Sequence, residues 1–162
     1  MPKRKALTPA EERLWRALIR IVISLPRLLE TDILRSTGLT SNEYITLMSL
    51  SEAPNRELRM ADLAHAAALS PSRITRLVED LQSRGFVAKR PSSSDGRGNV
   101  AILTTQGLAK LKSAYPEHLA SVRRRVFDHM EPASIKRTAD ALAGLAAELE
   151  DKPLLAAEVG KS

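Results

Sequence analysis

The sequence predicts a mainly α fold with one small β hairpin, and three observations lead to that prediction. Aromatic residues make up only 3% of the 162 residues, so a core must consist of Leu, Ile, Val and Ala, which favours helices. Apolar residues recur at helical spacing over most of the chain. A stretch rich in Ser, Gly and Asp at residues 91–99 separates two short strand-like runs. At this length we expect one compact domain of moderate size.

The first predicted helix begins at a capping box. Thr8 and Glu11 have the spacing of reciprocal N-terminal caps, and Pro9 suits the first helical position. Pro26 interrupts the apolar pattern, so we expect a bend near it. The pattern then resumes and ends before Gly38. The apolar stripe consists of Leu14, Trp15, Leu18, Ile21, Val22, Leu25, Leu28, Leu29 and Ile33.

Two shorter helices are predicted next. A second capping box at residues 40–43 (TSNE) opens a helix that ends before Pro54. Residues 60–68 form a short helix whose small alanines allow a close approach to its neighbour. The apolar residues are Tyr44, Leu47, Met48 and Leu50 in the first helix, and Leu63, Ala64 and Ala67 in the second.

The helix that follows Ser70 is predicted to bury one face and to present a polar one. Ser70 suits the N-cap and Pro71 the first helical position, and Gly85 tolerates the positive φ of a C-terminal stop. At 100° per residue, the apolar side chains fall within about 100° of one another and form a core face. These are Ile74, Leu77, Val78 and Leu81; opposite lie Ser72, Arg76, Glu79 and Ser83, flanked by Arg73 and Asp80 on one side and Thr75 on the other.

A basic hairpin comes after this helix. Residues 86–90 and 100–103 are the predicted strands, joined by the loop at residues 91–99. With the tight connection at residues 69–70, the order of helix, turn, helix and hairpin is that of a winged helix-turn-helix, with the hairpin as its small β wing.

Two further helices are predicted, at residues 105–130 and 132–149, and Pro116 is a place where the first can kink. Their apolar stripes are Leu108, Leu111, Tyr115, Leu119, Val122 and Val126 in the first, and Ile135, Ala139, Leu142, Leu145 and Leu149 in the second.

The division of the chain follows from these stripes. A winged helix-turn-helix DNA-binding lobe at residues 40–104 is too small to cover them. We therefore expect the helices of residues 8–39 and 105–149 to form a dimerisation region that pairs with a second copy. An ordinary intrachain helix bundle is the alternative. Residues 1–7 and 150–162 are expected to be flexible tails.

Five segments carry a resemblance to a known family. They are residues 69–72 (LSPS), 74–78 (ITRLV) together with Leu81, 84–85 (RG), 95–97 (DGR) and 103–107 (LTTQG). In these motifs, and in pattern over residues 10–149, the chain resembles the MarR family of bacterial transcription regulators. The resemblance implies a homodimer that binds double-stranded DNA, most commonly as a repressor. It also implies, as in many members, a phenolic or carboxylate effector that releases the DNA.

The polar face of the predicted recognition helix supplies the candidate DNA contacts. Ser70 and Ser72, with the free backbone N–H groups of the first turn, are expected to meet phosphates. Arg73 and Arg76 are the candidate base readers, because an arginine fork fits O6 and N7 of guanine. Thr75 can touch a thymine methyl group. A two-fold dimer would place two such helices about 34–36 Å apart, which predicts a pseudo-palindromic operator.

The hairpin supplies the remaining candidates. Lys89 and Arg90 are expected to contact phosphates, which gives affinity without sequence information. Arg97 can enter a narrow minor groove, and Asp95 can hold it through an ion pair. The formal net charge of +6 and the pI of about 10.0 suit a polyanion, although a basic surface kept for solubility explains them as well.

An effector site is expected between the dimerisation helices and the DNA-binding lobe, as the resemblance implies. Arg16 can pair with an anion there, beside Trp15, and Tyr44 and Met48 can line the site. Each of these four residues also fits an ordinary core or surface position.

Several other classes of function find no support. The chain has no Cys, which excludes disulfides and cysteine–zinc sites. His118 and His129 would lie about 16 Å apart on a straight helix, and His65 lies elsewhere, so no metal and no cofactor are expected. Enzyme motifs such as a glycine-rich phosphate loop are missing. With no long apolar run and no signal-peptide pattern, we expect a cytoplasmic protein that does not enter membranes. The alternative function is a winged-helix module that binds protein without sequence-specific DNA binding, although such modules usually lack a basic wing tip.

Overall fold

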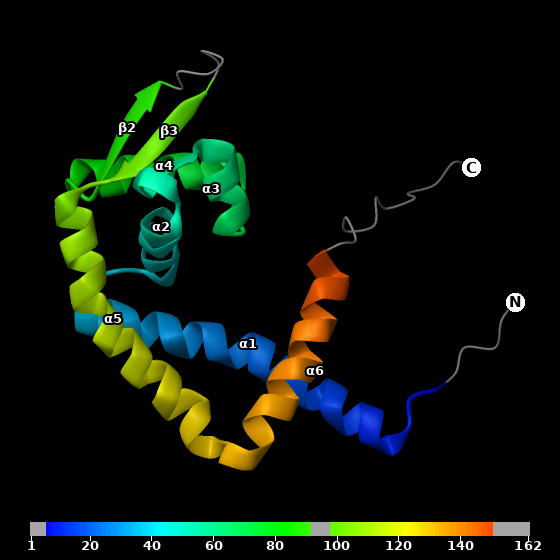
Figure 1. Cartoon of the computed structure of the whole chain (residues 1–162). Coiled ribbons are helices and arrows are strands. Elements are labelled where there is room, and N and C mark those ends of the chain that lie inside the picture. The colour runs from blue at the N-terminus through cyan, green and yellow to red at the C-terminus, as the bar shows by residue number, and fades with distance from the viewer. Residues whose placement is uncertain (1–5, 92–97, 151–162) are drawn as a thin grey trace, which may run out of the picture. The chain divides into compact units, whose positions relative to one another are not determined.

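The computed structural model describes residues 6–91 and 98–150 (Figure 1). They belong to two compact units, one that runs to Val122 and one that starts at Arg123. The helices are α1 (Pro9–Thr37), α2 (Ser41–Glu52), α3 (Met60–Ala66), α4 (Pro71–Ser83), α5 (Thr105–Arg125) and α6 (Pro132–Glu150), with short 3-10 turns at Pro54–Arg56 and Phe127–His129. The strands are β1 (Glu57–Arg59), β2 (Val87–Pro91) and β3 (Asn99–Leu103). The mainly α fold with a small β wing is confirmed.

The predicted helix caps are present. The Thr8 hydroxyl accepts a hydrogen bond from the Glu11 N–H (3.3 Å), and the Glu11 carboxylate accepts one from the Thr8 N–H (2.6 Å). The hydrogen bond from the Thr8 N–H to the carboxylate, with a further contribution from the Thr8 hydroxyl, holds the pKa of Glu11 below its ordinary value. Thr40 and Glu43 form the same box at the start of α2. Pro26 lies inside α1, which continues as one helix to the left-handed Gly38 (φ 70°).

The core of the first unit joins the end of α1 to α2, α3, α4, the sheet and the first half of α5. Ile33 is the buried residue of α1, and Leu111 and Ala114 are the buried apolar residues of α5. Leu, Ile, Val and Ala supply nearly all of the core, as the composition predicts. Its buried members are Ile33, Leu39, Tyr44, Leu47, Leu50, Leu63, Ala64, Ala67, Ile74, Val78, Leu81, Val87, Ala101, Leu103, Leu111 and Ala114.

The sheet has three strands, and the sequence predicted only two of them. Its order is β1-β3-β2, with both pairs antiparallel. Ile102 in the central strand lies opposite Glu57 of β1 and Ala88 of β2. β1 contains only Glu57, Leu58 and Arg59, too few for an alternating pattern, and it exists because β3 supplies its hydrogen-bond partners.

The predicted helix at residues 105–130 is wrong at its C-terminal end. α5 stops at Arg125, Val126 leaves the helical region (φ −123°, ψ −67°), and a 3-10 turn follows. The apolar spacing runs on to Val126, so the pattern gave no signal of this break. The short helix α3 also ends earlier than predicted, at Ala66, because Ala68 adopts a positive φ (51°) in the turn before α4.

Candidate nucleic-acid interface

The helix α4 divides into a buried and an exposed face, as its sequence predicts. Ile74 is 1% exposed, and Val78 and Leu81 are fully buried. Leu77 is partly buried against the same core. The exposed side chains of this helix include Ser72, Arg73, Arg76, Glu79, Asp80 and Ser83. The core therefore fixes which side chains α4 presents to solvent.

The first turn of α4 is capped by serine. The Ser70 hydroxyl accepts a hydrogen bond from the Arg73 N–H (3.4 Å) and lies 3.3 Å from the Ser72 hydroxyl. Pro71 occupies the first helical position, where no N–H partner is needed. The Thr75 hydroxyl donates to the Pro71 carbonyl (2.8 Å), so its proton already has a partner. Both predicted serines thus lie at the positive end of the helix dipole.

Two arginines on the exposed face of α4 have unused donors. Within residues 6–91 and 98–150, the side chains of Arg73 and Arg76 take part in no hydrogen bond or ion pair. Each guanidinium offers five N–H donors in a planar fork. The geometry leaves both free to meet an acceptor outside the chain.

The two basic residues of β2 are engaged within the chain. Arg90 contacts both carboxylate oxygens of Glu57 on β1, at 2.9 and 2.8 Å. The Lys89 ammonium lies 3.8 Å from the carboxylate of Glu79 on α4. Sequence reasoning missed both pairs, since β1 was not predicted and Glu79 lies ten positions away. Asp95 and Arg97 lie outside the described residues.

The motif at residues 103–107 holds the start of α5 against the end of α4. The Thr104 hydroxyl donates to the carbonyls of Gly85 (2.7 Å) and Phe86 (3.1 Å) and accepts from the Gly107 N–H (2.9 Å). Gln106 donates to the Arg84 carbonyl at 3.4 Å. These hydrogen bonds therefore hold the C-terminal end of α4 and Phe86, the residue before β2, against the first turn of α5.

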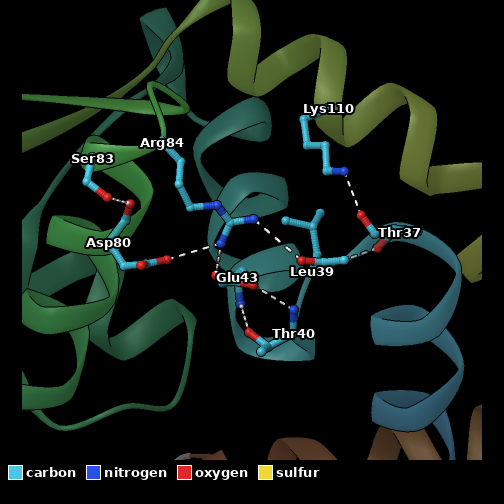
Figure 2. Close-up of polar contacts among 9 residues, drawn as sticks. Thr37, Leu39, Thr40, Glu43, Asp80, Ser83, Arg84 and Lys110 are labelled. Carbon is cyan, nitrogen blue, oxygen red and sulfur yellow. Dashed lines mark hydrogen bonds and ion pairs between the residues drawn. The ribbon is translucent and has the colours of Figure 1, made fainter.

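Arg84, at the C-terminal end of α4, joins three helices (Figure 2). Its Nη1 bonds to a carboxylate oxygen of Glu43 and lies 3.1 Å from that of Asp80, while its Nη2 donates to the Gly38 carbonyl (3.4 Å). The guanidinium carbon also lies 5.0 Å from the centre of the Phe86 ring. Burial alone would lower the pKa of Arg84, but the hydrogen bonds and charges of Asp80 and Glu43 together raise it. From the sequence alone, only the Arg-Gly motif is apparent here.

The four candidate effector residues lie in different surroundings. Trp15, on α1, is 55% exposed, and Arg16 pairs with Glu12 one turn earlier (2.6 Å). Tyr44, on α2, is 3% exposed, and Met48 packs partly buried against the core. The structure thus places two candidates on the surface of α1 and two at the core.

The Tyr44 ring contacts a histidine of α5. Its centroid lies 4.5 Å from that of His118, with the ring planes 33° apart. Burial raises the pKa of Tyr44 and lowers that of His118. The contact ties α2 to the second half of α5.

None of the helices in the described part of the chain has both the length and the apolar character that crossing a bilayer requires. Within the same residues, no three histidine or acidic side chains gather where they could hold a metal ion.

Sequence comparison relates this chain to bacterial regulators. Residues 37–98 match the profile of the MarR family. The HTH-type transcriptional repressor YetL of Bacillus subtilis is 32% identical over 85 residues, which are 52% of this chain and 51% of that protein. The repressor Rv2887 of Mycobacterium tuberculosis is 38% identical over 77 residues, 48% of this chain and 54% of that protein. The chain spans about half the length of the curated relatives it matches.

Comparison of folds extends the similarity to nearly the whole chain. The crystal structure of AbsC, a MarR family transcriptional regulator from Streptomyces coelicolor, has a TM-score of 0.81 and 34% identity, and the match covers 91% of this chain and 99% of that one. That of Sco3205, a MarR family regulator from the same organism in complex with DNA, has a TM-score of 0.83 and 32% identity, with 95% of each chain covered. The matched proteins are regulators and not enzymes, as the sequence led us to expect.

Proposed function

The chain belongs to the MarR family of transcriptional regulators, and on that premise we propose that it is a sequence-specific repressor of transcription that binds double-stranded DNA. One observation carries the proposal. Among the residues that the structure describes, Arg73 and Arg76 have no partner on the exposed face of α4, while the opposite face of the same helix is buried in the core. The DNA complex of the similar Sco3205 supports it.

In the proposed complex, α4 lies in the major groove. Arg76 and Arg73 read base edges, because their forks match the two acceptors of guanine. Ser70 and Ser72 meet phosphates at the start of the helix, where the dipole favours an anion. Thr75 contributes its methyl group, since its hydroxyl proton is used within the helix.

The wing acts beside α4. Lys89 and Arg90 add positive potential near the phosphates, although each must share its charge with Glu79 or Glu57. We propose that Arg97, held by Asp95, enters the minor groove. The two strands that lead to these residues are β2 and β3.

The protein is proposed to act as a homodimer on a pseudo-palindromic operator, with the helices of residues 8–39 and 105–149 as the dimerisation region. Exposed apolar side chains on α1 support this, because a helix that turns such residues to water gains by covering them. The most exposed of them on α1 are Leu14, Trp15, Ile21, Val22 and Ile23.

A small aromatic or carboxylate effector is proposed to release the DNA by changing the spacing of the two α4 helices. Trp15, Arg16, Tyr44 and Met48 remain the candidate residues. Trp15 is the single tryptophan of the chain, so its fluorescence reports binding nearby. Titration with 4-hydroxybenzoate should change that fluorescence and lower DNA occupancy over the same concentration range. A change in neither signal would remove this class of effector from the proposal.

The DNA-binding proposal is tested by selecting duplexes from a random-sequence pool with the purified protein. We expect an enriched inverted repeat whose binding weakens steeply with salt. Arg76→Ala should lose about 1–3 kcal/mol on the selected duplex and relax the preference at one base pair in each half-site. Arg137→Ala, which removes the same charge from an exposed position on α6, is the matched control and should bind like the parent.

Two outcomes would contradict the proposal. A pool that shows no enrichment would favour the winged-helix module that binds protein. Equal binding by Arg76→Ala, Arg73→Ala and the parent would remove α4 as the reading element.

A further inference from the structure

The C-terminal end of α1 is held by two cations from other helices. The last carbonyls of a helix have no partner within it and carry the negative end of its dipole. Here the Thr37 carbonyl accepts from the Lys110 ammonium of α5 (2.6 Å), and the Gly38 carbonyl accepts from Arg84 (3.4 Å). Figure 2 shows the contact between Lys110 and Thr37.

Arg84 also contacts a second helix, α2. The same guanidinium bonds to Glu43, which is only 7% exposed and closes the capping box of α2 through the Thr40 N–H (2.6 Å). Because this carboxylate is buried, loss of its pairing with Arg84 would leave a buried charge without a partner. One side chain thus binds the end of α4, the end of α1 and the start of α2.

We propose that this joint, made of Arg84, Lys110, Glu43 and the carbonyls of Thr37 and Gly38, fixes the direction of α1 relative to α4. Arg84 is then a positioning residue that sets the separation of the two α4 helices in the dimer. The inference rests on the proposed function, since that separation matters only for a dimer on DNA.

The length of α1 makes the joint sensitive. Its 29 residues span about 44 Å at 1.5 Å per residue. A turn of about 5° at one end of such a lever moves the other end by roughly 4 Å. That displacement is close to the rise of about 3.4 Å for one base pair. A small change at the joint is therefore enough to shift the preferred half-site spacing.

The first test measures the joint without DNA. The chain has no cysteine, so one cysteine on α1 (Arg20→Cys) and one on α4 (Gln82→Cys) allow two spin labels per protomer. Labelled protomers are diluted into unlabelled protein, and the distance between the labels is measured by double electron–electron resonance. We expect one narrow distribution for the parent.

Glu43→Gln should broaden or shift that distribution. Glutamine still accepts from the Thr40 N–H as a capping-box residue, so the change removes the charge that faces Arg84 and spares the cap. Lys110→Met, which keeps the apolar stem, should act in the same direction. Asp80→Asn is the matched control, since it removes an exposed partner of Arg84 and leaves the contacts with Glu43 and Gly38. If both Glu43→Gln and Lys110→Met gave the distance distribution of the parent, the proposal that these contacts fix the direction of α1 would be wrong. If Glu43→Gln does not fold, the measurement on Lys110→Met decides.

The second test uses DNA. The half-site selected by the parent is placed in duplexes at the selected spacing and with one base pair inserted or removed. For Glu43→Gln we expect the discrimination between spacings to fall about tenfold, with affinity for a duplex of one half-site unchanged. An equal loss on every duplex would show a merely structural role and overturn the inference. If the parent prefers no duplex, the proposed function fails, while the spin-label distances still decide whether the joint exists.

Discussion

Gly107 of α5 lies directly against the backbone carbonyl of Phe86. A Cβ atom at residue 107 would be 2.1 Å from that oxygen and 2.8 Å from Cδ1 of Leu103. Both neighbours are fixed, one as backbone and the other in the core. Glycine is required here for space, because the first turn of α5 packs against Phe86, which lies between α4 and β2.

Gly107→Ala should therefore destabilise the protein by about 1–3 kcal/mol, the usual cost of overpacking. Alanine has a higher helix propensity than glycine by about 1 kcal/mol, which alone would stabilise the protein. A loss of stability therefore means that overpacking outweighs helix propensity, and a gain means the reverse. Urea unfolding measures the change in stability. Gly144→Ala on α6 is the control, since no atom of the described residues lies within 4 Å of the added methyl group, and it should be neutral or stabilising. A Gly107→Ala protein as stable as the parent would contradict the close contact.

Glu57→Gln should strengthen binding to nonspecific DNA. The change removes a negative charge beside the wing and releases Arg90 from its two contacts. A freed arginine that reaches one more phosphate steepens the dependence of log K on log salt by about 0.9. Titration of a random duplex at several salt concentrations measures this slope.

Glu117→Gln is the comparison for that experiment, because it removes one exposed carboxylate from α5 and, within the residues that the structure describes, releases no arginine or lysine from an ion pair. Equal slopes in the two variants would mean that Arg90 gains no phosphate when Glu57 is neutral.

The burial of His118 predicts a pH-dependent stability. Burial lowers the pKa of His118 in the folded protein below its value of about 6.5 in the unfolded chain. Neutral His118 therefore contributes to stability fully above about pH 6.5. This contribution is lost as the pH falls through the folded pKa, because the unfolded chain binds the proton more tightly than the folded protein does. In His118→Phe, the free energy of unfolding should fall less between pH 7.5 and pH 5.5 than in the parent.

Urea unfolding at three pH values tests this, with the exposed His65→Gln as control. Parallel profiles for the parent and His118→Phe would show that the histidine does not titrate differently on folding.

Val22→Glu should weaken self-association. Val22 is 67% exposed on α1, within the apolar stripe that we propose to meet a second copy. A carboxylate buried there without a partner costs several kcal/mol. Sedimentation equilibrium measures the change in the dimer dissociation constant. Arg20→Glu, about 160° away around the helix, should have little effect. A parent that sediments as a monomer would refute the dimer itself.

Local signals made much of this fold predictable. The caps at Thr8, Thr40 and Ser70 depend on residues within three positions, and the buried face of α4 depends on helical spacing. Such information is present in a short window of sequence. The caps and the core face of α4 were therefore predicted correctly.

Contacts between distant segments were not predictable in the same way. β1 forms because β3 pairs with it more than 40 residues later. The contacts of Arg84 with Glu43 and Gly38 span 41 and 46 residues, so the sequence showed only an arginine before a glycine. The pairing of Arg90 with Glu57 follows from the same missed strand and changes the role that sequence alone suggests for Arg90.

The bonds of Thr104 to the carbonyls of Gly85 and Phe86 bear on the engineering of new specificity. In a chimera that takes only α4 from another regulator, the residues after the transplanted helix would have to pack against a Thr104 and a Gly107 that did not evolve with them. The segment suited to exchange therefore runs from the cap at Ser70 to Gly107. It transfers α4 together with the Thr104 hydroxyl and the Gly107 position that hold its C-terminal end.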